Sequence, residues 1–92
     1  MKLTIGKTYK VEAVKNMTYG SIVKMEDGTT NLIHISNMAD QFVKNVDDHI
    51  VIGQTYYPVA VPGKVKEVEL TLRPSKIKEY QDSAQAEKAE KN

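Results

Sequence analysis

The chain has 92 residues, a formal net charge of +1 and no cysteine. This length limits it to one domain with a modest core, and the lack of cysteine excludes disulfide bridges and thiolate metal sites. The near-neutral charge argues against nucleic-acid binding that rests mainly on a large basic surface. Residues 1–6 contain no long apolar run, so we expect no signal peptide, no membrane span and a cytoplasmic protein.

The first quarter of the chain predicts two strands. Residues 7–15 alternate between apolar and charged side chains, which is the period of a half-buried strand. The side chains expected to face the core are Tyr9, Val11 and Ala13. Residues 19–25 form the second predicted strand, and Gly20 within it indicates a bulge or a sharp coil.

A turn and a third strand follow. Asp27-Gly28 is a strong turn signal, and residues 31–35 form the third predicted strand. Because successive side chains of a strand point to opposite faces, Leu32 and His34 share one face. Tyr19 and His34 would then lie on neighbouring strands and form one flat patch on which unpaired nucleic-acid bases can stack.

The middle of the chain predicts a crossover. Residues 36–52 space their apolar side chains irregularly, which indicates one or two short helical turns, the first capped by Ser36. Residues 54–61 and 65–72 form the fourth and fifth predicted strands, separated by a turn at Pro62-Gly63. Three strands, a short helical crossover and two more strands predict an all-β, five-stranded Greek-key barrel of the OB type.

The last segment differs in composition. We expect a barrel domain at residues 1–74 and a charged tail, rich in Ala, Glu and Lys, at residues 75–92. Ile77 and Tyr80 are three positions apart and can dock one helical turn onto the barrel. Beyond them the sequence has no face to bury, which predicts a partly helical or disordered tail.

Five segments of the chain form a family pattern with preserved spacing. They are Ile5-Gly6-Lys7, Tyr19-Gly20-Ser21-Ile22-Val23, Leu32-Ile33-His34-Ile35-Ser36, Ile52-Gly53-Gln54 and Val68-Glu69-Leu70-Thr71-Leu72-Arg73. Together they resemble the ribosomal protein S-one-type RNA-binding domain, over about residues 5 to 73. The resemblance implies a five-stranded OB barrel that binds single-stranded RNA.

The resemblance also implies a binding face. Tyr19 would stack on a base, His34 would contact a base or a phosphate, and Ile22 would pack against a base or a ribose. The family usually has a second aromatic where Ile22 stands, so one stacking position, worth on the order of 1–3 kcal/mol per base, is lost here. The cations that we expect to pair with phosphates are Lys24, Lys64 and Lys66.

Two further departures from the family pattern lie near the fifth strand. The family often has an aspartate in the loop before this strand and an arginine at its start. This chain has Pro62 near the first place and Glu67 near the second, and a glutamate repels phosphate. RNA binding would then depend mainly on contacts to the bases rather than to the phosphates. We therefore expect it to be weak.

Some of these residues also fit structural roles. His34 fits a surface histidine hydrogen-bonded to a loop, and Tyr19 fits an aromatic that covers the barrel mouth. Asp47-Asp48-His49 contains metal-ligand types, but adjacent loop residues rarely converge on one ion, so we expect a solvated loop, no metal and no cofactor. Since no nucleophile–base pair or phosphate-binding glycine loop occurs, we expect no catalytic residues and no enzyme.

The sequence thus predicts a small stand-alone, monomeric module for single-stranded RNA, of low sequence specificity, acting in RNA metabolism or translation. Ribosome or RNA-processing proteins are candidate further partners. One alternative is a protein-interaction module that docks on a ribosome, a polymerase or a nuclease, with RNA binding reduced or lost. A second alternative is single-stranded DNA binding on the same face.

Overall fold

The computed structural model describes residues 3–63 and 66–80, which form a mostly β structure. The strands are β1 (Val11–Met17), β2 (Gly20–Met25), β3 (Thr30–His34), β4 (Thr55–Tyr56), β5 (Val59–Pro62) and β6 (Val68–Thr71). Two short 3-10 turns, η1 (Ile35–Asn37) and η2 (Val46–Asp48), lie between β3 and β4. Residues 74–80 are helical, and the predicted tail beyond residue 80 lies outside the described residues.

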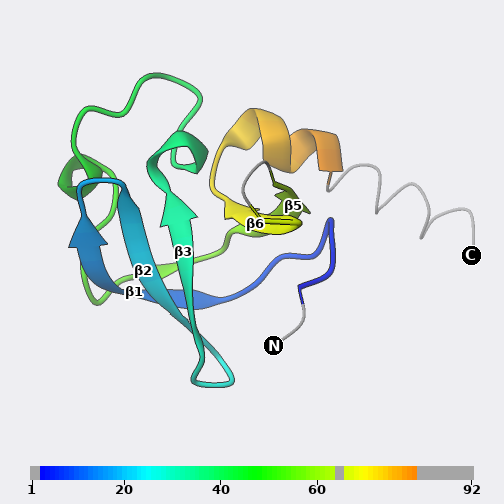
Figure 1. Cartoon of the computed structure of the whole chain (residues 1–92), viewed down its shortest axis with the longest axis horizontal. Helices are drawn as coiled ribbons and strands as arrows, with labels where there is room; N and C mark the ends of the chain where they lie inside the picture. The colour runs from blue at the N-terminus through cyan, green and yellow to red at the C-terminus, as the bar shows by residue number, and fades with distance from the viewer. Residues whose placement is uncertain (1–2, 64–65, 81–92) are drawn as a thin grey trace, which may run out of the picture.

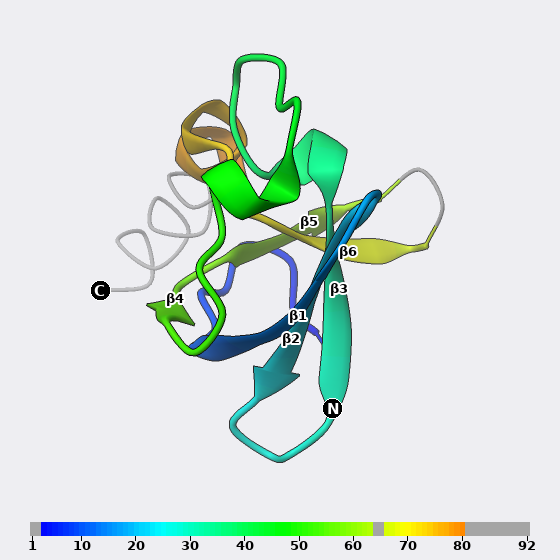
Figure 2. The ribbon, with the colours of Figure 1, turned by 90° about the vertical axis from the view of Figure 1, so that its left-hand side faces the viewer.

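The strands form two sheets that together make a curled half-barrel. One sheet has the order β3-β2-β1-β4, and the other is the antiparallel pair β5-β6. Figures 1 and 2 show β1, β2 and β3 on one side of the molecule and the β5-β6 pair beside them. The N-terminal segment links the sheets, because Gly6 N–H donates to the Ala60 carbonyl at 2.7 Å and Tyr9 N–H donates to the Pro58 carbonyl at 2.9 Å.

The core lies inside this curl. The residues that the sequence predicts to face inward from the first strand, Tyr9, Val11 and Ala13, are all buried. Val23 of β2, Ile33 of β3 and Leu70 of β6 are fully buried as well. In β1, β2 and β3 these buried side chains alternate with exposed or half-buried ones, so the opposite face of these three strands is turned toward solvent.

Of the two features predicted at Gly20, a bulge or a sharp coil, the bulge is wrong. Gly20 pairs regularly with His34, and the register shifts instead in β1, between Ala13 and Lys15. A Cβ atom at Gly20 would lie 2.5 Å from the Ile33 carbonyl oxygen. Glycine is therefore required here because β3 approaches closely, which is the other reason for a glycine inside a strand.

The predicted fourth strand, residues 54–61, is divided in two. Its first part, β4, pairs with β1, and its second part, β5, pairs with β6. Pro58 lies between them, and proline cannot donate a hydrogen bond to a ladder. The chain passes at this point from one sheet to the other.

The helical segment is attached to the connection between β3 and β4. The Ser75 N–H and hydroxyl groups both donate to the Asp40 carboxylate, and the Arg73 Nε lies 3.2 Å from Asp40 Oδ1. These hydrogen bonds hold the pKa of Asp40 below its ordinary value of 3.8, and the bond from the Ser75 hydroxyl contributes most to this shift. Ile77 and Tyr80 are half-buried.

In the part of the chain that the structure describes, no helix is long and apolar enough to cross a membrane.

Candidate nucleic-acid interface

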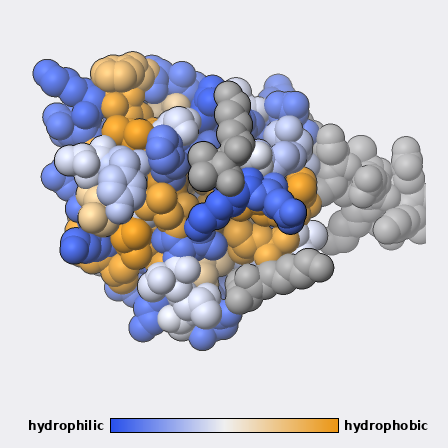
Figure 3. Space-filling view, viewed as in Figure 1, coloured by the Kyte–Doolittle hydropathy of each residue, from blue (hydrophilic) through white to orange (hydrophobic). Residues whose placement is uncertain are grey.

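The outward face of β1, β2 and β3 contains most of the residues predicted for the site. The register aligns Lys15 of β1, Ile22 of β2 and Leu32 of β3 in one row across the strands. The next row consists of Met17, Gly20 and His34. Ser21 and Ile33, which lie between the two rows, and Val23, which follows Ile22, are fully buried, so both rows face solvent. In Figure 3 apolar and hydrophilic side chains are interspersed over this part of the molecule.

His34 is exposed, and its partner across the ladder, Gly20, has no side chain that could cover the ring. The Ser36 N–H donates to His34 Nδ1 at 3.1 Å, and the Ser36 hydroxyl lies 2.8 Å from the same nitrogen. Nδ1 is therefore the acceptor, and we assign the proton of the neutral ring to Nε2. Within residues 3–63 and 66–80 no partner of Nε2 is found, so this N–H is available as a donor to a ligand.

This hydrogen bond corrects the predicted cap of the first helical turn. His34, not Ser36, is the N-cap residue of η1, because its side chain accepts from the Ser36 N–H. The sequence suggested Ser36 because serine is a common N-cap. The observed cap fixes the orientation of the histidine ring at the end of β3.

Tyr19 lies in the turn between β1 and β2 and is 47% exposed. Its hydroxyl donates to the Met17 sulfur at 3.2 Å, which holds the ring against the outward face. Its carbonyl accepts from the Ile35 N–H at 2.9 Å, so the turn is joined to the end of β3. Tyr19 and His34 therefore occupy the same end of the face, as the patch that the sequence predicts requires.

A shallow hollow next to His34 extends the face toward β6. Leu32 and His34 line one side of it, and Lys66 and Val68 line the other. The remaining lining residues are polar: Asn31, Asn37 and Glu69. The Asn37 side-chain amide donates to Glu69 at 3.3 Å. With Lys66 and Glu69 in the lining, one basic and one acidic side chain border the same hollow.

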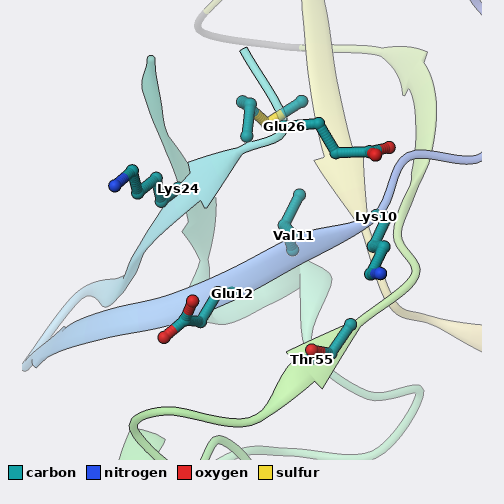
Figure 4. A pocket seen from close by; sticks show the side chains of 7 residues that line it. Lys10, Val11, Glu12, Lys24, Glu26 and Thr55 are labelled. Atoms are coloured by element: carbon teal, nitrogen blue, oxygen red, sulfur yellow. The ribbon is translucent and has the colours of Figure 1, made fainter. Parts of the chain in front are cut away.

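The other two lysines are placed differently. Lys24 lies on the outward face two positions beyond Ile22, directly opposite Glu12 of β1. It borders a separate hollow with Lys10 and Glu26, and Figure 4 shows its amine pointing away from the Glu26 carboxylate. Lys64 lies outside the described residues.

Two face residues were missed at the level of sequence, Lys15 and Met17, whereas Leu32 lies on the face of His34 as the sequence predicts. Strict alternation from Val11 and Ala13 would point Lys15 into the core, and the register shift after Ala13 turns it outward instead. A charged residue at an expected core position was thus the available signal of a bulge.

The Asp47-Asp48-His49 loop is used locally. Asp47 accepts a hydrogen bond from the Asn16 side chain at 2.8 Å, and residues 46–48 form η2. Among the described residues, no group of three or more His, Asp or Glu side chains could hold a metal ion.

Comparisons with known proteins agree with this fold. No protein-family model matches the chain. The chain is 36% identical over 70 residues, 76% of its length, to a polyribonucleotide nucleotidyltransferase of Sulfurovum sp.. Its structure resembles GSP13 from Bacillus subtilis, with a TM-score of 0.66 and 25% identity over 80% of this chain and 58% of that one.

The chain carries an S-one-type OB-fold domain. The fold of this domain also matches a chain in the a/eIF2alpha-aDim2p-rRNA complex from Pyrococcus horikoshii, with a TM-score of 0.68 at 18% identity, over 98% of this chain and 55% of that one.

The chain spans only part of the length of the curated relatives that it matches. It is 32% identical over 53 residues, 58% of its length, to the uncharacterized protein YabR of Bacillus subtilis and covers 41% of that protein. The same chain covers 10% of the Sulfurovum nucleotidyltransferase.

Proposed function

We propose that this S-one-type domain binds single-stranded RNA on the outward face of β1, β2 and β3. The observation that supports the proposal most is the His34 ring, which lies opposite a glycine and beside Tyr19, with its Nε2–H available to a ligand. A base can stack on the tyrosine ring while the histidine donates to a base or a phosphate. Ile22 and Leu32, which are half-buried, offer apolar contact in the next row.

The names of two similar proteins are consistent with this proposal. One relative is a polyribonucleotide nucleotidyltransferase, and the complex that contains a chain of similar fold includes rRNA.

We infer for this chain a binding module rather than an enzyme. We also infer that β4 and β5 serve as one interrupted strand of a five-stranded Greek-key barrel.

We further propose that binding is weak and of low sequence specificity. Among the described residues, few cations border the face: Lys15 and Lys24 lie on it, and Lys66 borders the hollow beside His34. Glu12 and Glu69 lie next to two of them. Because Lys and Arg contacts to phosphates dominate nucleic-acid affinity, stacking and the histidine must supply most of the binding free energy.

The experiment is a titration of a labelled mixed-sequence single-stranded RNA, followed by fluorescence anisotropy at low salt. Tyr19→Ala and His34→Ala should each lower the affinity, the tyrosine variant by about 5- to 100-fold, because one stacked base contributes about 1–3 kcal/mol. Tyr57→Ala is the matched control, since Tyr57 is an exposed aromatic that follows β4 and is not part of β1, β2 or β3. Equal affinity in all four proteins would refute the proposed site.

A DNA strand of the same sequence tests the second alternative. The proposed face recognises bases and phosphates, which RNA and DNA share, so only a contact to the 2′-hydroxyl would separate them. Tighter binding of DNA than of RNA would favour a single-stranded DNA module.

One observation favours the protein-interaction alternative. Val14, Val51 and Ile52 are all at least 40% exposed. They lie close together, because the Gly53 N–H donates to the Ala13 carbonyl at 2.8 Å. Exposed apolar groups that cluster are typical of protein contacts. A domain that binds no RNA and loses a protein partner upon Val14→Asp substitution would support this alternative.

A further inference from the structure

The connection between η1 and η2 presents an aromatic ring to solvent. Phe42, the single phenylalanine of the chain, is 88% exposed. Its neighbour Val43 is buried, so the loop does bury an apolar side chain at this point and turns the larger one outward. An exposed phenylalanine contributes little to the core, and its flat ring is suited to stacking.

Phe42 borders a hollow of about 300 Å³, of whose eight lining residues four are apolar and four are polar or charged. Ile35, Ala39 and Val43 supply apolar atoms, and Ser36 and Gln41 supply groups that can hydrogen-bond to a planar polar ligand. The volume is at the lower end of the range of small-molecule sites, which is about 300–1,000 Å³. The combination of a ring, apolar walls and a few hydrogen-bonding groups fits a nucleobase.

The hollow begins where the proposed RNA face ends. Ile35, which lines the hollow, donates its N–H to the Tyr19 carbonyl at 2.9 Å. Ser36, which also lines it, is hydrogen-bonded to His34. In Figure 1 the loop between η1 and η2 arches beyond the end of the sheet at which β3 enters η1. An RNA strand bound over Tyr19 and His34 therefore leads directly to Phe42.

The charges around the hollow favour a base over a phosphate. Asp40 and Arg73 both border it, and they form an ion pair with 3.2 Å between Nε and Oδ1. The Asp40 carboxylate also accepts two hydrogen bonds from Ser75. The carboxylate would repel a phosphate placed here, and its ion pair with Arg73 offsets the attraction of that cation, whereas an uncharged base would not be repelled.

We propose that Phe42 is an additional stacking platform, which takes the base adjacent to those bound by Tyr19 and His34. The proposal rests on the proposed RNA binding and extends it by one subsite. This subsite adds an aromatic ring on the η1–η2 connection to the outward face of β1, β2 and β3. On that face, Ile22 offers no stacking plane. The bound RNA should therefore turn from the sheet onto the loop.

Tryptophan fluorescence tests this proposal directly, because the chain has no tryptophan. Phe42→Trp introduces a single indole into the hollow, and a base stacked on it should quench its emission. Tyr57→Trp is the matched control, since that position is an exposed aromatic outside the hollow and the face. The titrant is oligouridylate of increasing length, with binding followed in parallel by anisotropy.

We expect quenching in Phe42→Trp, over the same concentration range in which anisotropy reports binding, and constant emission in Tyr57→Trp. Phe42→Ala should lose about 5- to 100-fold in affinity for the longer oligonucleotides. It should bind the shortest ones, which do not reach the loop, as the unaltered chain does.

The outcomes separate the two proposals. If RNA binds at Tyr19 and His34 while the emission of Phe42→Trp and the affinity of Phe42→Ala stay unchanged, the stacking role of Phe42 is wrong and the proposed function stands. If no RNA binds to the unaltered chain, both proposals fail. A protein partner lost only in Phe42→Ala, with RNA binding intact, would instead assign the ring to a protein contact.

Discussion

At the scale of single residues, the absence of a side chain at Gly20 shapes the candidate interface. A Cβ atom there would lie 2.5 Å from the Ile33 carbonyl oxygen and 3.1 Å from His34 Cα. The close approach of β3 that this glycine allows also leaves the His34 ring uncovered. One residue thus determines both strand pairing and access to the histidine.

Gly20→Ala should therefore destabilise the domain by about 1–3 kcal/mol, since overpacking of this kind forces backbone atoms apart. Urea unfolding measures the change. Gly28→Asn is the control: Gly28 has a φ of 89° with open space around its Cβ position, and asparagine tolerates positive φ better than other side chains. An alanine variant as stable as the unaltered protein would contradict the proposed reason for this glycine.

Ile22 offers a gain-of-function test. It lies between Lys15 and Leu32 on the proposed face and provides apolar contact without a stacking plane. Ile22→Tyr should raise the affinity for single-stranded RNA by up to about 1–3 kcal/mol, the contribution of one stacked base. Ile22→Leu, which adds no ring, should leave the affinity measured by anisotropy nearly unchanged. Equal affinities of the two variants would argue against base stacking at this position.

At the scale of elements, one connection holds the far end of the fold together. The Leu72 N–H donates to the Asn37 carbonyl at 2.7 Å, which joins the residue after β6 to η1. Asp40, three residues later, accepts from Ser75 at the start of the helical segment. The connection between β3 and β4 therefore positions both Phe42 and residues 74–80.

The Asp40 attachment predicts a pH dependence. Because its folded-state pKa lies below the ordinary 3.8, its stabilisation is fully present above pH 3.8 and is lost as the pH falls through the lower folded-state value. Asp40→Asn should flatten the fall of the thermal midpoint below about pH 4. Part of the slope of the thermal midpoint against pH should remain in this variant, because the pKa of Asp27 is also lowered, by its hydrogen bond from Thr29. Parallel midpoint curves for variant and unaltered chain would show that Asp40 does not couple to folding.

Sequence patterns could predict the strands but not the points where the ladder changes. Alternation located the inward residues Tyr9, Val11 and Ala13, and the family pattern brought together Tyr19, Ile22 and His34. Alternation assumes that every residue advances the pleat by one step. The charge of Lys15 at an expected core position therefore signals a bulge nearby, but alternation does not say at which residue the register shifts. It also could not divide residues 54–61 between two sheets, since both parts have the composition of a strand.

At the scale of the whole molecule, the net charge of +1 predicts RNA binding with a shallow salt dependence. Each phosphate neutralised on a single strand contributes a slope of about −0.7 in log affinity against log salt. Lys66→Gln should reduce the slope by about this amount, because Lys66 borders the hollow beside His34. Lys24→Gln should change it less, because Lys24 lies opposite Glu12. Anisotropy titrations at several salt concentrations measure both slopes, and a larger effect of Lys24 would reverse the assigned roles.

Binding of single-stranded RNA on the outward face around Tyr19 and His34 is the proposal on which the other binding predictions depend. The most direct measurement is an amide NMR titration of the labelled chain with a short single-stranded RNA at low salt. We predict chemical-shift changes concentrated at Tyr19, Gly20, Ile22 and His34, with smaller changes around Val14 and Ile52. No shifts at millimolar RNA, or shifts confined to Val14 and Ile52, would contradict the proposal.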